Sequence, residues 1–241
     1  MRALVLAAGK STRLGELGRL RPKPMLPLRG RPVLEWTLDQ LRRAGVGEIV
    51  INLHHAPEII PAHFGDGAGW GLSISYVVEP EILGTAGAVR NARHLLGTGT
   101  FLVVYGDTVL DWDPSAMIRE HQAYRPVVTM VVDEVRDASR LGVVRWNHDQ
   151  YVDAFVEKPG QRPELGRWVS AGVLLLEPSA VAHIPPHGPS DLGTDLFPAL
   201  LAERLPMRVY RRPRPLLLLD TPEQYRAAEQ TWAPPAEAVA P

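Results

Sequence analysis

The sequence predicts an α/β protein whose mixed, mainly parallel sheet carries helices on both faces. Through residue 107, short apolar runs alternate with amphipathic segments, in the order strand, helix, strand, helix, strand, helix, strand. That alternation is typical of parallel strands joined by helices that cover both faces of a sheet. After about residue 125, apolar runs follow one another with little helix between them. This second pattern predicts an antiparallel or mixed extension of the same sheet.

The first apolar run, "RALVLAAG" (2–9), predicts a buried strand that enters a loop at Gly9. Residues 33–44 carry apolar side chains at helical spacing and are followed by Gly45, which predicts a helix that ends there. Further strands are expected at 48–53, 72–78 and 101–107, and further helices at 57–64 and 85–96.

The second part of the chain is expected to begin with strands at 127–132, 142–146, 152–157 and 168–177. A helix interrupted near Pro198 is expected at 194–203, and a closing helix at 222–232. No internal repeat and no clear linker divides the chain. We therefore expect a single domain over residues 1–232, followed by a flexible tail at 233–241.

The composition argues against several classes of protein. The 241 residues include no cysteine and carry a net charge of -1. Such a chain has no disulfides or thiolate metal sites, and it has no overall field to attract DNA, RNA or an anionic membrane. The apolar stretch 3–8 is too short for a signal peptide, and no window reaches the roughly 18 apolar residues of a membrane span. We therefore expect a cytoplasmic protein with no nucleic-acid or membrane partner.

The loop after the first strand, "LAAGKSTRLG" (6–15), resembles two phosphate-binding motifs without matching either. A P-loop requires a glycine where the chain has Leu4, and the dinucleotide fingerprint requires glycines at Ser11 and Leu14. Residues 9–31 nevertheless hold seven cations and one acid, with Lys23 between two prolines that stiffen the chain around it. A glycine-containing loop with a lysine in a fixed position predicts a polyphosphate-binding site. The alternative is that this basic loop is simply exposed to solvent.

A second loop, "YGDTVLDWD" (105–113), places Asp107 at the end of a run that should be buried. A carboxylate in such a position needs a partner. Mg²⁺ is one such partner, because it binds one or two carboxylates together with substrate phosphates. An aspartate that caps the following turn is the alternative. The presence of a phosphate loop in the same chain favours the magnesium site.

These motifs resemble those of the sugar-1-phosphate nucleotidyltransferases, and most of all the mannose- and heptose-1-phosphate guanylyltransferases. In that family, a glycine-rich loop with Thr-Arg-Leu precedes Pro-Lys-Pro, and the lysine follows the arginine by ten residues, as Lys23 follows Arg13. "LGTAGAVRNA" resembles the base-contacting loop and helix, and "YGDT" resembles the metal-binding aspartate. "LGVV" and "FVEKP" resemble the sugar-binding segments, and "DTPEQY" the closing motif. The matches run in order from residue 3 to about 230.

The resemblance implies a GT-A-like (Rossmann-like) fold and transfer of a nucleotidyl group from an NTP to a sugar 1-phosphate, with Mg²⁺ as cofactor and NDP-sugar and pyrophosphate as products. It also allows a homo-oligomer. Residues 1–125 would form a nucleotide-binding half and residues 126–232 a sugar-binding half. The sugar phosphate would attack without a general base. The catalytic residues implied are therefore groups that hold charge, namely Arg13, Lys23 and Asp107.

The binding residues that the resemblance implies fall into three sets. The nucleotide would contact Leu6, Ala7, Ala8, Gly9, Lys10, Ser11, Thr12, Arg13, Gly84, Thr85 and Asp107. The sugar phosphate would contact Lys23, Gly142, Glu157, Lys158 and Ser170. The metal would be held by Asp107 and Asp220.

The sequence departs from the family pattern at three places. Ser11 replaces a glycine, and Ser170 stands where asparagine is common. In the closing motif, the family's second metal aspartate aligns with Leu218, which cannot bind magnesium. Either Asp220 reaches the metal through a shifted register, or another acid substitutes, or the site is weak; the candidate substitutes are Asp111, Asp113 and Asp195.

Two rival functions remain open. A cytidylyl-type transferase of the same fold, acting on a non-sugar phosphate, would share the opening loop, although the "PKP" spacing and "FVEKP" favour a sugar. A non-catalytic sugar-nucleotide-binding paralogue is supported by Leu218 and opposed by Asp107 and Lys23. The base and the sugar are not readable from the sequence, although "LGTAGAV" favours GTP with a mannose- or heptose-type sugar.

Overall fold

A computed structural model describes residues 1–11, 14–212, 217 and 219–234 of the chain. Its internal contacts group the chain into two compact units. Unit 1 consists of Met1–Ile82, Val104–Pro114 and Leu217–Pro241. Unit 2 consists of Leu83–Val103 and Ser115–Leu216. Each unit therefore contains segments that are distant in the sequence.

Unit 1 is built on parallel strands. β1 (Arg2–Leu6) pairs with β4 (Glu48–Leu53), and β4 pairs with β5 (Ser73–Val78), each in parallel. β6 (Phe101–Tyr105) neighbours β1, and its last two residues belong to this unit. The carboxyl ends of these strands share one edge, which is where ligands bind in open α/β sheets.

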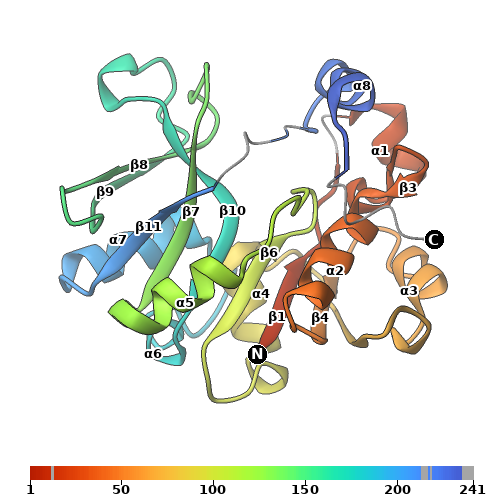
Figure 1. The fold of residues 1–241 in the computed structure, drawn as a ribbon, viewed down its shortest axis with the longest axis horizontal. Helices are drawn as coiled ribbons and strands as arrows, with labels where there is room; N and C mark the ends of the chain where they lie inside the picture. The colour runs from red at the N-terminus through yellow and green to blue at the C-terminus, as the bar shows by residue number, and fades with distance from the viewer. Residues whose placement is uncertain (12–13, 213–216, 218, 235–241) are drawn as a thin grey trace. The chain divides into compact units, whose positions relative to one another are not determined.

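The helices of unit 1 form where the sequence supplies the matching signals. In α2 (Val33–Arg43), the apolar residues Val33, Leu34, Leu38 and Leu41 recur at helical spacing and are buried, two arginines occupy the last turn, and Gly45 follows with φ 77°. The other helices and short strands of this unit are α1 (Glu16–Leu20), the 3-10 turn η2 (Lys23–Met25), β2 (Pro27–Leu28), β3 (Arg31–Pro32), α3 (Ile59–Phe64), η3 (Ala68–Trp70) and α8 (Pro222–Thr231). Figure 1 shows α2 in front of β1 and β4.

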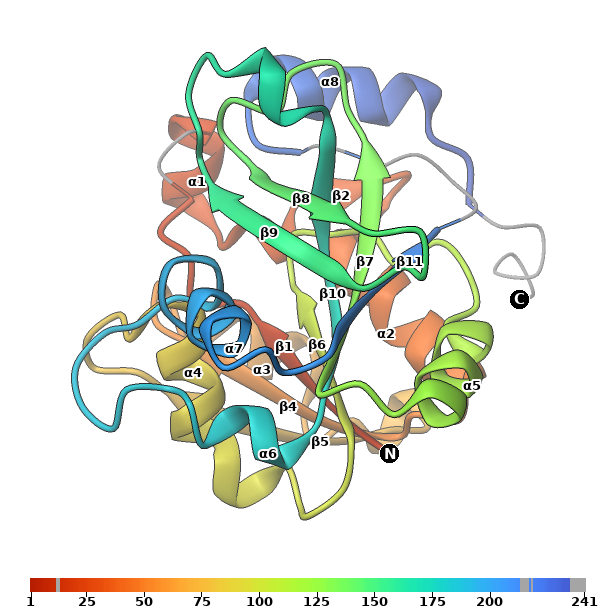
Figure 2. The same cartoon turned by 90° about the vertical axis from the view of Figure 1, so that its left-hand side faces the viewer.

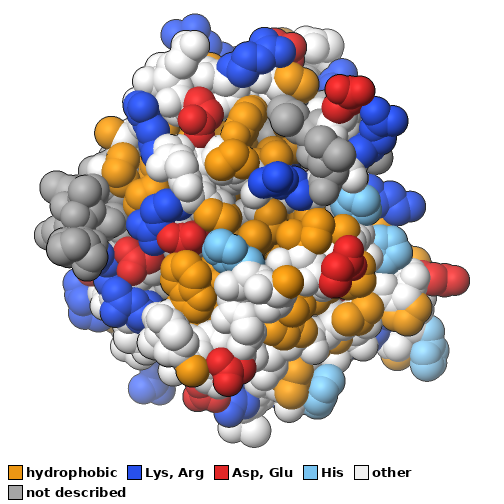
Figure 3. Space-filling model, turned by 90° about the vertical axis from the view of Figure 1, so that its right-hand side faces the viewer, with side chains coloured by type: hydrophobic (Ala, Val, Ile, Leu, Met, Phe, Trp, Pro, Cys, Tyr) orange, Lys and Arg blue, Asp and Glu red, His pale blue; other side chains and the backbone are white. Residues whose placement is uncertain are grey.

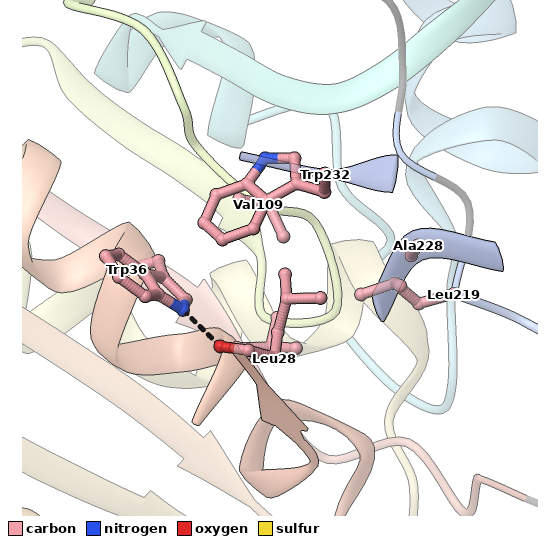
Figure 4. Packing of buried hydrophobic residues seen from close by; sticks show 7 residues of the cluster. Leu28, Trp36, Val109, Leu219, Ala228 and Trp232 are labelled. Atoms are coloured by element: carbon pink, nitrogen blue, oxygen red, sulfur yellow. Dashed lines mark hydrogen bonds between the residues drawn. The ribbon is translucent and has the colours of Figure 1, made fainter. Parts of the chain in front are cut away.

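The last helix, α8, is fixed to the early part of unit 1 by a hydrophobic cluster (Figure 4). Trp232 packs edge-on against Trp36, with ring centroids 5.1 Å apart, and the Trp36 indole N–H donates to the Leu28 carbonyl at 2.9 Å. Leu219 and Val109 complete the contact. The helix itself begins with a capping box at Thr221 and a proline in its first turn.

Unit 2 contains a mixed sheet with strand order β11-β7-β10, and β8 joins β10 to β9. β7 (Val128–Glu134) is antiparallel to β10 (Trp168–Leu176) and parallel to β11 (Met207–Arg211). β8 (Gly142–Trp146) is antiparallel to β9 (Val152–Glu157) and to β10. The ribbon of Figure 2 shows β8 and β9 crossing in front of β10.

The helices of unit 2 cover its sheet. α5 (Ser115–Tyr124) and α7 (Phe197–Ala202) lie on opposite faces, as Figures 1 and 2 both show. The remaining elements are α4 (Gly84–Ala92), η4 (Arg93–Leu95), η5 (Pro163–Leu165), α6 (Pro178–Val181) and the π-helical turn η6 (Leu192–Leu196). Every helix in the described part of the chain is too short or too polar to cross a membrane.

The predicted fold class, α/β with a mixed, mainly parallel sheet, is confirmed. The predicted bounds of the strands at 48–53, 142–146 and 152–157 match the observed ones. The helix expected at 194–203 is instead η6 followed by α7, with Pro198 in the first turn of α7, where a proline is tolerated. The division into a nucleotide half and a sugar half at residue 125 stays a prediction, and the described part of the expected tail ends at residue 234.

Candidate active site

The strongest candidate for a catalytic centre is in unit 1, where one lysine holds two aspartates. The Lys23 ammonium donates to Asp107 Oδ2 at 2.8 Å and to Asp220 Oδ1 at 2.5 Å. The Lys23 side chain is only 10% exposed, whereas those of Asp107 and Asp220 are 37% and 19% exposed. A buried ammonium needs such partners, and two carboxylates against one ammonium leave a net negative charge that can attract a further cation.

Lys23 is held in place by its flanking prolines and by the 3-10 turn that it begins. The carbonyls of Pro22 and Lys23 accept hydrogen bonds from the amides of Met25 and Leu26, at 2.8 and 3.0 Å. The Lys23 amide donates to the hydroxyl of Ser11 at 3.0 Å. Two proline rings, a tight turn and an external acceptor leave the Lys23 backbone little freedom, so its ammonium has a defined position.

The position of Asp107 depends on the close approach of the end of β6 to the end of β1. It follows β6 by two residues, and the intervening Gly106 donates its amide to the Leu6 carbonyl at 2.8 Å. A Cβ at Gly106 would lie 2.9 Å from that carbonyl oxygen and 3.2 Å from Pro24 Cγ. Only glycine therefore lets the end of β6 come close enough to β1 to place the Asp107 carboxylate beside Lys23.

Asp220 is anchored on both sides. Leu219 before it is buried in the Trp36–Trp232 cluster, and the amides of Asp220 and Thr221 both donate to the Gln224 side chain, at 3.0 and 3.2 Å. Of the alternatives open in the sequence, Asp220 is the one that the structure brings to Lys23 and Asp107. Leu218 itself lies outside the described residues.

The other acids named as substitutes have different surroundings. Asp195 belongs to unit 2, where its Oδ2 accepts the Asp191 amide at 2.7 Å. Asp111 is buried and Asp113 is exposed, and neither has a hydrogen bond to Lys23. Among the described residues, no three His, Asp or Glu side chains gather into a metal site made of protein alone.

The glycine-rich loop begins where β1 ends. Leu6 is its last strand residue, Ala7 and Ala8 are buried, and Gly9 and Lys10 are exposed. Ser11 adopts a left-handed backbone with φ 55°, which costs a non-glycine residue about 1–2 kcal/mol. The serine that stands in place of the family's glycine therefore occupies a position whose backbone conformation favours glycine. Thr12 and Arg13 lie outside the described residues.

Two buried polar residues that sequence reasoning missed support this loop from β4 and from the residue after β5. Asn52 Oδ1 accepts the Ala7 amide at 2.7 Å, and Asn52 Nδ2 donates to Glu79 Oε1 at 2.8 Å. Both residues are almost fully buried, at 3% and 2% exposure. The signal that could have found Asn52 is a polar side chain within the buried apolar strand "EIVINL". Glu79 follows the partly exposed strand "SISYVV", which gives no such signal.

A cavity of about 380 Å³ opens beside the loop. Its lining includes Lys10 and Ser11 from the loop, Glu16 and Arg19 from α1, which pair at 3.2 Å, and His55, two residues after β4. Figure 3 views the molecule from the side of α1 and α3 and shows Lys, Arg and His side chains among hydrophobic ones on this face. Lys10 and Arg19 outnumber the single acid of the lining, Glu16, so the cavity suits an anionic ligand.

Unit 2 brings three of the residues expected at the sugar phosphate together. Gly142 pairs with Glu157 across β8 and β9, and the Lys158 ammonium lies 3.5 Å from Glu157 Oε1. A Cβ at Gly142 would lie 2.9 Å from Glu157 Oε2, and one at Gly193 in η6 would lie 2.5 Å from the same atom. The Glu157 carboxylate is thus seated against two glycines. The sequence analysis missed Gly193. Its role depends on the π-helical turn η6, which only the structure shows.

The remaining candidates of unit 2 have separate environments. Gly84 has φ 74°, and a Cβ there would lie 2.4 Å from the Ser190 carbonyl oxygen. The Thr85 hydroxyl donates to Asp191 Oδ1 at 3.0 Å and accepts the Leu192 amide at 2.8 Å, so it joins the start of α4 to the segment before η6. Ser170 begins the irregular stretch of the β7–β10 pairing, between Ser170 and Leu174.

Comparison with known proteins defines the class to which this fold and site belong. The chain belongs to the nucleotidyl transferase family, whose model matches residues 2–213. It is 34% identical to the mannose-1-phosphate guanylyltransferase of Mycobacterium tuberculosis over 201 residues, which cover 83% of this chain and 55% of that protein. It is 33% identical to the UTP–glucose-1-phosphate uridylyltransferase of a Synechocystis strain over 219 residues, which cover 86% of this chain and 56% of that protein. The chain thus spans about half the length of these relatives.

Solved structures agree with the family assignment. The crystal structure of HddC from Yersinia pseudotuberculosis matches with a TM-score of 0.80 and 25% identity, covering 95% of this chain and 98% of that one. The same protein complexed with GMP-PN matches with a TM-score of 0.78 and the same identity.

Proposed function

We propose that the protein transfers a nucleotidyl group from an NTP to a sugar 1-phosphate, producing an NDP-sugar and pyrophosphate. Family membership supports the reaction class. The observation that carries the proposal is the Lys23 ammonium held between Asp107 and Asp220. A non-catalytic paralogue would not need a buried lysine placed between two acids from distant parts of the sequence.

The chemistry requires no general base on the protein. A phosphate monoester has its second pKa at about 6, so the sugar phosphate is largely dianionic at neutral pH. One of its oxygens forms a bond to the α-phosphorus of the NTP while the bond from that phosphorus to the bridging oxygen of the β-phosphate breaks. The electron pair leaves with pyrophosphate. The protein's task is to align two anions and to neutralise charge as it develops.

The two carboxylates beside Lys23 fit a divalent cation. Mg²⁺ prefers one or two carboxylates and completes its octahedral shell with phosphate oxygens and water. Asp107 and Asp220 supply that number of ligands and already converge on one positive charge. We infer that they hold Mg²⁺, which would supply charge neutralisation at the phosphates. Lys23, which these acids orient, would then be free to donate to an oxygen of the attacked phosphate.

We assign the NTP phosphates to the glycine-rich loop. The segment Leu6–Ser11, with Thr12 and Arg13 after it, would offer backbone amides and the Arg13 guanidinium to the triphosphate. The cavity beside Lys10, lined by two cations and one acid, supports this assignment. Gly84 and Thr85 would lie against the base, through backbone and ring contact, because the Thr85 hydroxyl is engaged by Asp191 and Leu192.

We assign the sugar 1-phosphate to the cluster in unit 2. Glu157 would accept hydrogen bonds from sugar hydroxyls, and Gly142 would leave room for the ring. Lys158, whose side chain is 71% exposed, would pair with the phosphate in place of its long contact to Glu157. Ser170 would contribute a hydroxyl to the sugar or ribose.

For specificity we propose GTP with a mannose- or heptose-type sugar. The relative from M. tuberculosis is a mannose-1-phosphate guanylyltransferase, and the HddC structure was solved with GMP-PN. The Synechocystis relative is named for UTP and glucose 1-phosphate, so UTP with glucose 1-phosphate is the second pair to test. A cytoplasmic location and a homo-oligomer remain predictions.

The test is pyrophosphate release from the purified protein with Mg²⁺, with the NDP-sugar identified by mass spectrometry. GTP, dTTP, UTP, CTP and ATP are crossed with hexose and heptose 1-phosphates. We expect one productive pair, and a fall in kcat of about 100-fold or more in Asp107→Asn and in Asp220→Asn. The matched control is Asp39→Asn in α2, whose carboxylate pairs with Arg42 and Arg43, and it should keep wild-type kcat.

Two results would overturn the proposal. Nucleotide binding without turnover across the panel would identify a binding paralogue, and turnover with a non-sugar phosphate would identify the cytidylyl-type alternative. Full activity in Asp220→Asn, with activity lost in Asp107→Asn, would remove Asp220 from the metal site and leave the transferase assignment standing.

A further inference from the structure

Ser11 and Lys23 are joined by a hydrogen bond that the family motif does not require. The Ser11 hydroxyl accepts the Lys23 amide at 3.0 Å, across twelve residues of sequence. Proline has no backbone N–H, so in the run Pro22–Pro24 the Lys23 amide is the only backbone donor. Ser11 is therefore the acceptor of the one main-chain N–H that this run can donate.

Ser11 is itself tightly seated. Its carbonyl accepts the Leu14 amide at 3.1 Å, and a Cβ added at Gly18 would lie 2.1 Å from that carbonyl oxygen and 2.9 Å from Ser11 Cβ. His55 Nε2 lies 3.2 Å from the Gly18 carbonyl oxygen and ties that residue to the end of β4. The hydroxyl that meets Lys23 thus comes from a residue packed against α1 and, through α1, against the sheet.

We propose that Ser11 is a positioning residue for Lys23, holding the Lys23 backbone so that its ammonium lies between Asp107 and Asp220. The inference rests on the proposed function, in which Lys23 acts on the attacked phosphate. It also joins the phosphate loop to the Pro-Lys-Pro turn, so the two segments move together. The serine replaces a glycine although its φ of 55° favours glycine, and the hydroxyl is what the replacement adds.

The first test measures the Lys23 amide directly and needs no activity. Hydrogen exchange in the Pro22–Pro24 run reports on Lys23 alone, because the prolines have no exchanging amide. In Ser11→Gly and in Ser11→Ala, we expect this amide to exchange about tenfold or more faster than in the wild type, because its acceptor is gone. The control is Ser73→Ala, an exposed serine on β5 of the same unit, which should leave the rate unchanged. An unchanged rate in both Ser11 variants would overturn the proposal.

The second test separates positioning from support of the fold. Ser11→Gly relieves the left-handed backbone, so its melting temperature should equal or exceed that of the wild type. Its kcat should nevertheless fall by about tenfold, and Ser11→Ala should show a fall of the same size. A kcat equal to that of the wild type in both variants, or a loss that follows melting temperature across the two, would contradict the proposal.

The two tests also separate this inference from the proposed function. If the wild type forms no NDP-sugar with any substrate pair, the proposed function fails, and the exchange rate still decides whether Ser11 holds Lys23. If the wild type is active and the Ser11 variants keep its kcat, only the positioning role fails.

Discussion

The ammonium of Lys23 lies 2.5 Å from Asp220 Oδ1, across 197 residues of sequence. The same ammonium lies 2.8 Å from Asp107 Oδ2. Three segments that are far apart in the chain therefore meet at a single positive charge. The family pattern alone did not decide which acid lies beside Lys23 and Asp107, because the alignment places a leucine where the second metal aspartate should be.

Lys23→Met should make the fold dependent on magnesium. Without the ammonium, two carboxylates face each other, and we expect a loss of about 1–3 kcal/mol in the free energy of unfolding in metal-free buffer, since Asp107 is partly exposed. Saturating Mg²⁺ should then raise the melting temperature of Lys23→Met more than that of the wild type, in which the lysine already pairs with both acids.

Differential scanning fluorimetry with and without Mg²⁺ measures this difference. Lys10→Met, an exposed lysine in the neighbouring loop, serves as the control and should behave as the wild type does without nucleotide. Equal magnesium shifts in wild type and Lys23→Met would show that the metal does not bind where the lysine holds the acids.

Gly193→Ala should displace the Glu157 carboxylate, because the new Cβ would lie 2.5 Å from Oε2. We expect the KM for the sugar 1-phosphate to rise about tenfold while the KM for the NTP stays within about twofold. Gly142→Ala should act in the same direction through Phe155 and Glu157, at 2.4 and 2.9 Å. Gly99→Ala is the control, because a Cβ there has no neighbour within 4 Å. A rise in the KM for the NTP alone would assign Glu157 to the nucleotide instead.

Thr129→Val should destabilise unit 2 without changing catalysis. The Thr129 hydroxyl contacts His121 Nδ1 at 2.8 Å, and His121 Nε2 donates to Glu177 Oε1 at 3.0 Å, with His121 only 2% exposed. Valine has nearly the same shape but leaves a buried ring nitrogen without its partner, at a cost of about 1–3 kcal/mol. Urea unfolding should show the loss, Thr98→Val at an exposed site should not, and a fall in kcat at full stability would contradict a purely structural role.

Tyr76→Phe should reduce the loss of folding stability that occurs at alkaline pH. Burial, with a smaller contribution from the Asp66 carboxylate, raises the pKa of Tyr76 from 10.0 to about 12. The unfolded chain therefore loses this proton first, so the stabilising contribution is complete below about pH 10 and declines as pH rises toward 12. Urea midpoints at pH 9 and pH 11 should fall less in Tyr76→Phe than in the wild type, and parallel profiles would refute the assignment.

The sequence was sufficient to predict strands that are rich in β-branched and aromatic residues. The strands at 48–53, 142–146 and 152–157 have the predicted bounds because such residues make up much of each strand and a polar residue follows each one, although only the first strand is buried along most of its length. α5 was missed because only Met117 and His121 are buried in its ten residues, so it has almost no apolar stripe. β11 was missed because two of its five residues are arginines and it lies just after a proline.

The residues of the candidate site likewise fall into those that the sequence predicts and those that it does not. Lys23 and Asp107 were predictable because short local motifs mark them. Asp220 was one of several possible acids, because the choice depends on where residues 219 and 221 are anchored, and only tertiary packing fixes that. Asn52, Glu79 and Gly193 were missed because each acts through a contact with a distant segment.

The composition of unit 1 from three separate segments has a consequence for biosynthesis. Domains tend to fold in order as the chain leaves the ribosome. Here Asp220 and the cluster residues Leu219 and Trp232 emerge only after the whole of unit 2 has been translated. Until then Lys23 can pair only with Asp107, and the apolar surface around Trp36 has no cover from α8. A nascent chain that has left the ribosome only as far as residue 216 would therefore have all the residues of unit 2 but an unfinished acid pair in unit 1.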